Sequence, residues 1–256
     1  MNSIWHVASL TALEARRHRG VPAVMLAFVI WMGAGWSLAS VTMGSTATIV
    51  IDFGLAGMAI LSNLYAILLT IQLTQQEREL RTLYVVLPRL SSRLVHVAGK
   101  FIGLAGILAG LVLGLSLLLA MAAWTLDWSQ WGSLVQACIA LIAETWISIA
   151  LAMVFSQASS LFLAVFYTLA VNVAGRFSFI IKQFGESIGG TAEWLTDIAY
   201  YLLPNLEAIN LRNRVVDMQP LGLSGMAELS AYAMTEIGLL LCIASILFLR
   251  KDLQAA

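Results

Sequence analysis

Charged residues are scarce in this sequence. Asp, Glu, Lys and Arg make up 11% of its 256 residues, whereas hydrophobic types make up 60%. Soluble domains carry about 25% charged residues, so the composition predicts a membrane protein. The fourteen basic residues balance the fourteen acidic ones, and a net charge of zero argues against nucleic acid as a partner.

Cysteine and histidine are also rare, and familiar chemical motifs are absent from the sequence. The two cysteines, Cys138 and Cys242, lie far apart in apolar runs, where they are typical of small buried side chains. The three histidines, His6, His18 and His96, do not have the spacing of metal ligands. No GxxxxGK(S/T) motif is present. We therefore expect no catalytic residue, no metal and no nucleotide site in this chain.

Long hydrophobic runs are what the sequence has in abundance. A helix needs about 20 apolar residues to cross a bilayer core of about 30 Å. Six stretches reach or approach that length: 21–42, 51–73, 99–123, 133–155, 161–179 and 230–249. They predict an all-α membrane protein with six transmembrane helices in a single domain, 1–256. The boundary between the fourth and fifth stretches is the least distinct, because only SQASS separates them.

Basic residues gather on one side of this arrangement. If both termini are cytoplasmic, the inner side holds ten of the fourteen: Arg16, Arg17, Arg19, Arg78, Arg81, Arg89, Arg93, Lys100, Arg250 and Lys251. The outer segments hold the other four: Arg176, Lys182, Arg212 and Arg214. The positive-inside rule therefore predicts cytoplasmic termini. Because basic residues precede the long first run, we expect an uncleaved anchor there.

Residues 4–18 form an amphipathic pattern before the first span. Trp5, Ala8, Ala12 and Ala15 follow helical spacing, and basic residues follow at the end of the segment. This pattern predicts a helix lying along the inner membrane surface. The alternative is an ordinary positively charged flank of the first span.

The segment 74–99, between the second and third spans, is unusually charged. An apolar stripe with helical spacing is formed by Leu80, Leu83, Tyr84 and Leu87. Pro88 ends this stripe, because proline lacks an amide hydrogen. We therefore predict a short helix over 77–88 on the inner membrane face. Glu77 and Glu79 exceed what orientation requires, which favours docking of another protein, whereas the alternative is a simple basic loop.

Glu144 lies near the middle of the fourth span. A carboxylate there costs about 2.5–3.5 kcal/mol on insertion scales, so we expect it to face protein or water. One interpretation is a contact with substrate or an ion in a central cavity. The other is an interhelical hydrogen bond, for which Asn63, Thr70 and Asn172 are the candidate partners.

Gly106, Gly110 and Gly114 in the third span are spaced by four and share one helix face, which would let another helix approach closely. They predict a packing face within the chain, with a dimer seam as the alternative. In the outer segment 180–229, we expect an interfacial amphipathic helix between Thr191 and Pro204. That helix could gate a pathway, dock a periplasmic partner or form a passive lid.

Three stretches together resemble a known family. ERELRTLYVVLPRLSSRLVHVAGK (77–100) is similar to the cytoplasmic segment of ABC-2 type transporter permeases, with a glutamate-led turn, a proline, Ser-Arg and then Gly-Lys. YYLLPNLEAINLR (200–212) lies before the last span, and FLRKDL (248–253) follows it. The YLLPN stretch is most similar to permeases of the multicopper-enzyme-maturation and gliding-type subgroup.

The resemblance implies a subunit of an ATP-driven exporter in a bacterial inner membrane. Two such subunits, identical or different, would pair with two ATPase subunits that hold ATP and magnesium. Residues 1–20 would form an elbow helix in contact with lipid, and the outer segment 180–229, between spans five and six, would form short helices that dip back toward the membrane. The coupling helix would contact the ATPase through Glu77, Arg78, Arg81, Leu83, Tyr84, Leu87 and Pro88.

Two other functions remain open at this point. The subunit could transmit ATP-driven movement to a periplasmic partner without transporting anything, and the acidic outer segment is the reason to consider this. It could instead be an ion-coupled carrier that uses Glu144. The sequence shows no inverted repeat and no paired broken helices, which are the usual signs of such a carrier.

Overall fold

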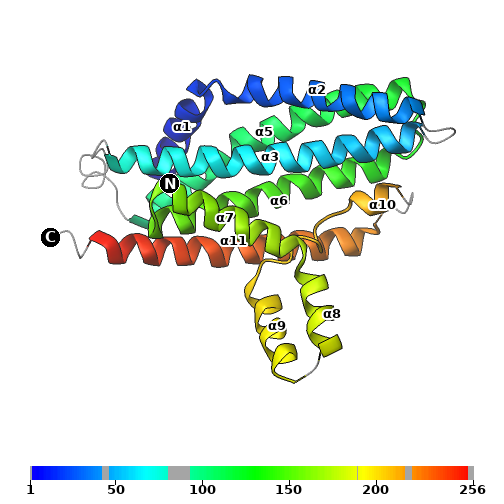
Figure 1. Ribbon diagram of the computed structural model, residues 1–256. Helices are drawn as coiled ribbons and strands as arrows, with labels where there is room; N and C mark the ends of the chain where they lie inside the picture. Colours follow the sequence, from blue (N-terminus) through cyan, green and yellow to red (C-terminus); the bar gives the residue numbers. More distant parts are fainter. Residues whose placement is uncertain (1, 42–45, 80–92, 189, 217–220, 253–256) are drawn as a thin grey trace.

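The computed structural model describes residues 2–41, 46–79, 93–188, 190–216 and 221–252 (Figure 1). Within these ranges the regular structure is entirely helical, with no strand. This confirms the all-α fold expected from the hydrophobic runs. The fifth predicted stretch, 161–179, is broken by a pronounced bend, and the site described below lies beside it.

Five helices are long and apolar enough to cross a membrane: α2 (Gly20–Val41), α3 (Thr46–Glu79), α5 (Arg93–Thr125), α6 (Trp131–Ala158) and α11 (Leu223–Asp252). A sixth span is formed if α7 (Leu161–Arg176) and α8 (Ser178–Ile188), which meet at a 65° bend, are counted together. All six predicted stretches overlap these helices. The protein is therefore a multi-pass membrane protein by length and composition of its helices.

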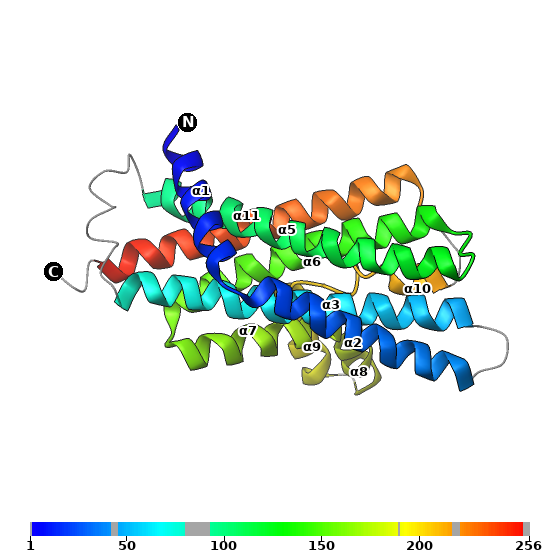
Figure 2. The ribbon, with the colours of Figure 1, turned by 90° about the horizontal axis from the view of Figure 1, so that it is seen from above.

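Helix α6 forms the centre of the bundle, because it packs against α3, α5, α7 and α11. The spans run side by side (Figures 1 and 2). We call the end with Glu79 and Arg93 the near end, and the end with Thr46 and Trp131 the far end. Helix α2 lies at the periphery and buries only Phe28, Gly35 and Ala39, so most of its surface is left for lipid or a partner.

Helix α7 is short for a span. Its 16 residues reach about 24 Å at 1.5 Å per residue, less than the bilayer core of about 30 Å. The boundary with α6 falls at Ser159 and Ser160, within the predicted SQASS stretch. After Arg176 the chain turns away, and α8 and α9 (Thr191–Leu202) leave the bundle as a pair (Figures 1 and 2). Helix α9 begins at the predicted threonine and ends two residues before Pro204.

A later segment of the chain forms a hydrogen bond with the C-terminal end of α7. The carbonyl oxygen of Gly175 accepts a hydrogen bond from the backbone N–H of Leu206, at 3.3 Å. A Cβ atom at Gly175 would lie 2.4 Å from the carbonyl oxygen of Pro204, so this close approach requires glycine. The contact supplies one partner for the carbonyl groups that a helix end leaves unpaired.

The N-terminal helix α1 (Asn2–Arg17) packs on α5 rather than standing apart from the bundle. It buries Ala8 and Ala15, as the pattern predicted, together with Val7 and Thr11. The side of α1 that carries Trp5 faces outward, and Trp5 is 71% exposed. The structure thus confirms a helix over this segment, with Trp5 turned away from the protein, whereas an elbow helix along a membrane surface stays a prediction.

Different glycines from the predicted ones hold α1 and α5 together. A Cβ atom at Gly103 would lie 2.5 Å from the carbonyl oxygen of Ala8, and one at Gly99 would meet Val7. By contrast, a Cβ atom at Gly106 or Gly110 would meet nothing within 4 Å, and one at Gly114 would meet only Met25. Within the described chain, no residue packs closely against Gly106 or Gly110, and a packing face there stays a prediction. A dimer seam at these positions stays a prediction.

The predicted coupling helix falls mostly outside the described residues. Helix α3 continues without a break through Glu79, so Glu77 lies in the last turns of a long helix instead of starting a new one. The stretch TQQERE has no glycine or proline and consists mainly of good helix formers, which explains this extension. The structure does not describe residues 80–92 or the side chain of Arg78. The proposed contacts of Arg78, Arg81, Leu83, Tyr84, Leu87 and Pro88 lie there.

Candidate functional site

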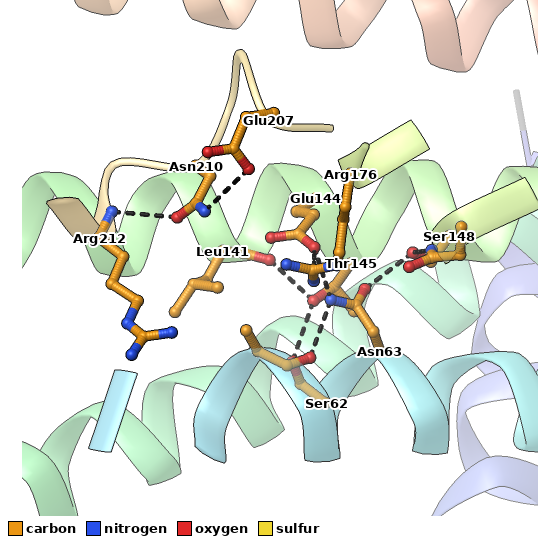
Figure 3. A network of polar contacts seen from close by, with 12 residues as sticks. Ser62, Asn63, Leu141, Glu144, Thr145, Ser148, Arg176, Glu207, Asn210 and Arg212 are labelled. Atoms are coloured by element: carbon orange, nitrogen blue, oxygen red, sulfur yellow. Dashed lines mark hydrogen bonds and ion pairs between the residues drawn. The ribbon is translucent and has the colours of Figure 1, made fainter. Parts of the chain in front are cut away.

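Glu144 is buried at the middle of the bundle and has two partners (Figure 3). The side-chain amide of Asn63 on α3 donates a hydrogen bond to Glu144 Oε1 at 2.9 Å. The guanidinium group of Arg176, the last residue of α7, forms an ion pair with the same oxygen. The break at the end of α7 therefore places the Arg176 cation beside the buried Glu144 carboxylate.

The polar network extends from Asn63 toward the near end. Ser148 Oγ donates to Asn63 Oδ1 at 2.8 Å, and Asn172 Nδ2 donates to Ser148 Oγ at 2.7 Å. Asn172, predicted as a direct partner of Glu144, is thus connected to it through two other side chains. Thr70, another predicted partner, is buried with no hydrogen bond from its hydroxyl among the described residues. The network ties together α3, α6 and α7.

Sequence reasoning missed the role of Arg176. It assigned this residue to the outer side, as one of four basic residues there. A buried carboxylate is strongly disfavoured unless a base or hydrogen-bond donors accompany it. The sequence signal was available, because Arg176 closes an apolar run too short to span the bilayer unaided.

A cavity of about 230 Å³ opens beside this ion pair, on the far-end side of Glu144. Small residues from two facing helices make the space, since alanine side chains leave room between α3 and α6. Its charged and amide groups are Glu144, Arg176, Arg212 and Asn210. The rest of the wall is apolar and consists of Leu55, Ala56, Ala59, Ile60, Ala137, Ala140, Leu141, Ile209 and Leu211.

A second ion pair lies at the edge of this cavity. Arg212, the first residue of α10 (Arg212–Val216), binds the Asp52 carboxylate of α3 through Nε and Nη2, with Nη2 2.7 Å from Oδ2. The hydrogen bonds to Asp52 raise the pKa of the Arg212 guanidinium above its ordinary value, so it stays charged. This pair fixes α10 against α3, and neither residue was singled out by the sequence.

The segment Glu207–Leu211 separates this cavity from a second one of about 630 Å³, since Ile209, Asn210 and Leu211 line both. Two hydrogen bonds, one just before the segment and one within it, hold the segment in place. The backbone N–H of Asn205 donates to the Tyr232 hydroxyl at 2.8 Å. The Asn210 side-chain amide donates to Glu207 Oε2 at 3.2 Å, as Figure 3 shows. The loop is therefore a packed partition between two cavities.

A second group of buried charges lies at the near end. The Lys100 ammonium is 2.6 Å from Glu77 Oε2 and also donates to the Leu73 carbonyl at 3.3 Å. His96 Nε2 is 3.5 Å from the same Glu77 oxygen. The void that these groups line holds only about 10 Å³. The structure gives the Glu77 carboxylate partners inside the bundle, and its predicted contact with an ATPase stays a prediction.

Metal ligation finds no support within the described part of the chain. No group of three or more His, Cys, Asp or Glu residues is close enough there to hold an ion. The ion-pair chemistry of the site is instead that of recognition, because a carboxylate and two guanidinium groups can bind and orient charged groups.

The chain matches no protein-family model, and no curated protein is significantly similar to it. The fold and the site together define a class: a multi-pass helical membrane protein with a charged cavity inside its bundle.

Proposed function

We propose that this protein is the membrane-spanning subunit of an ATP-driven exporter of the ABC-2 type, in a bacterial inner membrane with both termini cytoplasmic. The observation that carries the proposal is the cavity at the broken penultimate span, where Glu144 and Arg176 meet beside about 230 Å³ of space. A transport subunit needs such a polar, partly open space between its spans.

Three other features support the proposal. Helix α1 packs against α5 at the near end, where an elbow helix would lie along the cytoplasmic surface. Residues 80–92, which include most of the predicted coupling helix, connect the near ends of α3 and α5, where an ATPase would dock. The pair α8 and α9 precedes the last span, as the resemblance to this family implies. ATP and magnesium would then be held by two partner ATPase subunits, and catalysis would occur there.

A second candidate function has one observation in its favour. The pair α8 and α9 extends from the bundle and exposes large apolar side chains, among them Phe184 at 64% and Trp194 at 65%. Such a surface could pass ATP-driven movement to a periplasmic partner without transport. An ion-coupled carrier is less well supported, because Glu144 is already engaged by Arg176.

Purification with a mild detergent tests the proposal. We expect an ATPase with nucleotide-binding motifs to co-purify with the tagged protein. The double variant Arg78→Glu, Arg81→Glu should lose this partner, because charge reversal would disrupt docking at the near end. Arg214→Glu is the matched control, since Arg214 is exposed near the far end. A protein that transports its substrate when purified alone would contradict the proposal. Flux in proteoliposomes separates transport from the second candidate.

A further inference from the structure

The cavity of about 230 Å³ beside Glu144 and Arg176, called the inner cavity below, is lined by two guanidinium groups and one covered carboxylate. The Glu144 side chain is only 2% exposed, whereas that of Arg176 is 27% exposed. The second arginine of the wall, Arg212, is 39% exposed, and its partner Asp52, which is 35% exposed, is not part of the wall. A ligand would therefore meet guanidinium groups first, although each has a carboxylate partner.

Both guanidinium groups have donors beyond those used in their ion pairs. A guanidinium carries five N–H groups. In the described contacts, Arg176 uses one nitrogen on Glu144, and Arg212 uses two on Asp52. The remaining donors can bind a planar or tetrahedral anionic group, for which arginine geometry is well suited.

The remainder of the wall requires an apolar partner. Nine of its residues are Ala, Leu or Ile, and the only uncharged polar one is Asn210. A polyhydroxylated ligand such as a sugar would leave most of its hydroxyl groups unpaired against such a wall. The space of about 230 Å³ corresponds to about eight water molecules, which suits a head group with the first part of a chain.

We propose that the inner cavity binds an amphipathic anion. The phosphate or carboxylate group lies at Arg176 and Arg212, and the apolar part lies along the alanine wall of α3 and α6. This inference rests on the proposed function in treating the cavity as the place where a substrate binds. An amphipathic cation is disfavoured, because the only carboxylate in the wall is covered by Arg176 and Asn63. Two further acids lie near the wall: Asp52 is paired with Arg212, and Glu207 lines the neighbouring cavity.

Calorimetry on the purified full chain in phosphatidylcholine nanodiscs tests the proposal without ATP or any partner. The probes are octyl phosphate, octanoate, inorganic phosphate and octyltrimethylammonium. We expect the two amphipathic anions to bind, and the more tightly bound of them identifies the head-group chemistry. Inorganic phosphate should bind weakly, because it lacks the apolar part. Saturable binding of the cation as tightly as the anions would overturn the proposal with the unaltered protein alone.

Two variants localise the binding. Arg212→Gln should weaken the binding of octyl phosphate about tenfold, as expected for the loss of a charged hydrogen bond. The double variant Arg176→Gln, Glu144→Gln should do the same without leaving an unpaired carboxylate. Arg214→Gln removes an exposed arginine outside this wall and should leave the affinity unchanged. If all three variants bind octyl phosphate as tightly as the unaltered protein, the proposal is overturned. The binding measurement contains no ATPase, so it does not depend on the co-purification experiment. If the anions bind but no ATPase co-purifies, the proposed function fails and the anion site stands.

Discussion

The two buried clusters of charge use the same chemistry in different surroundings. At the near end, Glu77 and Lys100 close on each other around a void of about 10 Å³. At the middle of the bundle, Glu144 and Arg176 pair beside a cavity of about 230 Å³. The near-end pair, with little space around it, holds α3 against α5. A pair beside a cavity can also exchange one partner for a ligand.

Burial alone does not distinguish the two clusters. Lys100 and Glu144 are almost equally buried, at 2% and 1% exposure. What separates them is the neighbouring backbone: α3 and α5 are continuous around Lys100, whereas α7 breaks next to Glu144. The break places Arg176 beside the cavity that the alanine residues of α3 and α6 leave open. Breaking the near-end pair should therefore have a different effect from breaking the pair in the middle of the bundle.

The largest effect is expected from Glu77→Ala. This change leaves the Lys100 ammonium buried without its carboxylate, which should lower the free energy of unfolding by about 3–5 kcal/mol. Reversible unfolding in mixed micelles measures the loss. The double variant Glu77→Ala, Lys100→Met should recover most of it. A loss below about 1 kcal/mol would mean that the pair is hydrated like a surface pair.

Packing at the near end should be nearly as sensitive. Gly103→Leu forces a side chain into the Ala8 backbone, and overpacking of this kind costs about 1–3 kcal/mol. Gly106→Leu is the matched control, because a Cβ atom there would meet nothing within 4 Å among the described residues, and its effect should stay within about 0.5 kcal/mol. Equal losses in the two variants would show that α1 does not pack on α5 at Gly103.

In the middle of the bundle, Asn63→Ala should cost about 1–3 kcal/mol, because the change removes a hydrogen bond to Glu144 and another from Ser148. Asn172→Ala removes a single contact further along the network and should cost about 1 kcal/mol. Thermal unfolding of both variants gives the order. The reverse order would place the centre of the network away from Glu144.

Glu144→Gln should have the smallest effect on stability. The amide oxygen of glutamine can still accept hydrogen bonds from Asn63 and Arg176, so the loss is about 1 kcal/mol. Under the proposed function, transport should nevertheless fail, because the charge that positions Arg176 is gone. Flux and unfolding are measured on the same preparation. Normal assembly with normal transport would reduce Glu144 to a packing residue.

The sequence predicted the fold well because hydrophobic length is a local property. Every predicted span overlaps a helix, and the helix from Thr191 stops before Pro204 as expected. The site was less predictable, since it depends on which helices meet. Glu144 was identified as a single anomalous residue, but its pairing with Arg176 arises from the bend after α7. Likewise, Gly99 and Gly103 share the four-residue spacing of Gly106 and Gly110, and spacing alone does not tell which glycines meet another helix.

A ligand should be able to reach the middle of the bundle while the near end is closed. Cysteine labelling tests it most directly, in a background with Cys138→Ser and Cys242→Ser. Ala140 lines the cavity and Thr74 lines the near-end void, and both are similarly buried, at 2% and 3% exposure. We expect a small hydrophilic methanethiosulfonate to label Ala140→Cys and to leave Thr74→Cys unmodified. Labelling of Thr74→Cys with protection of Ala140→Cys would contradict it.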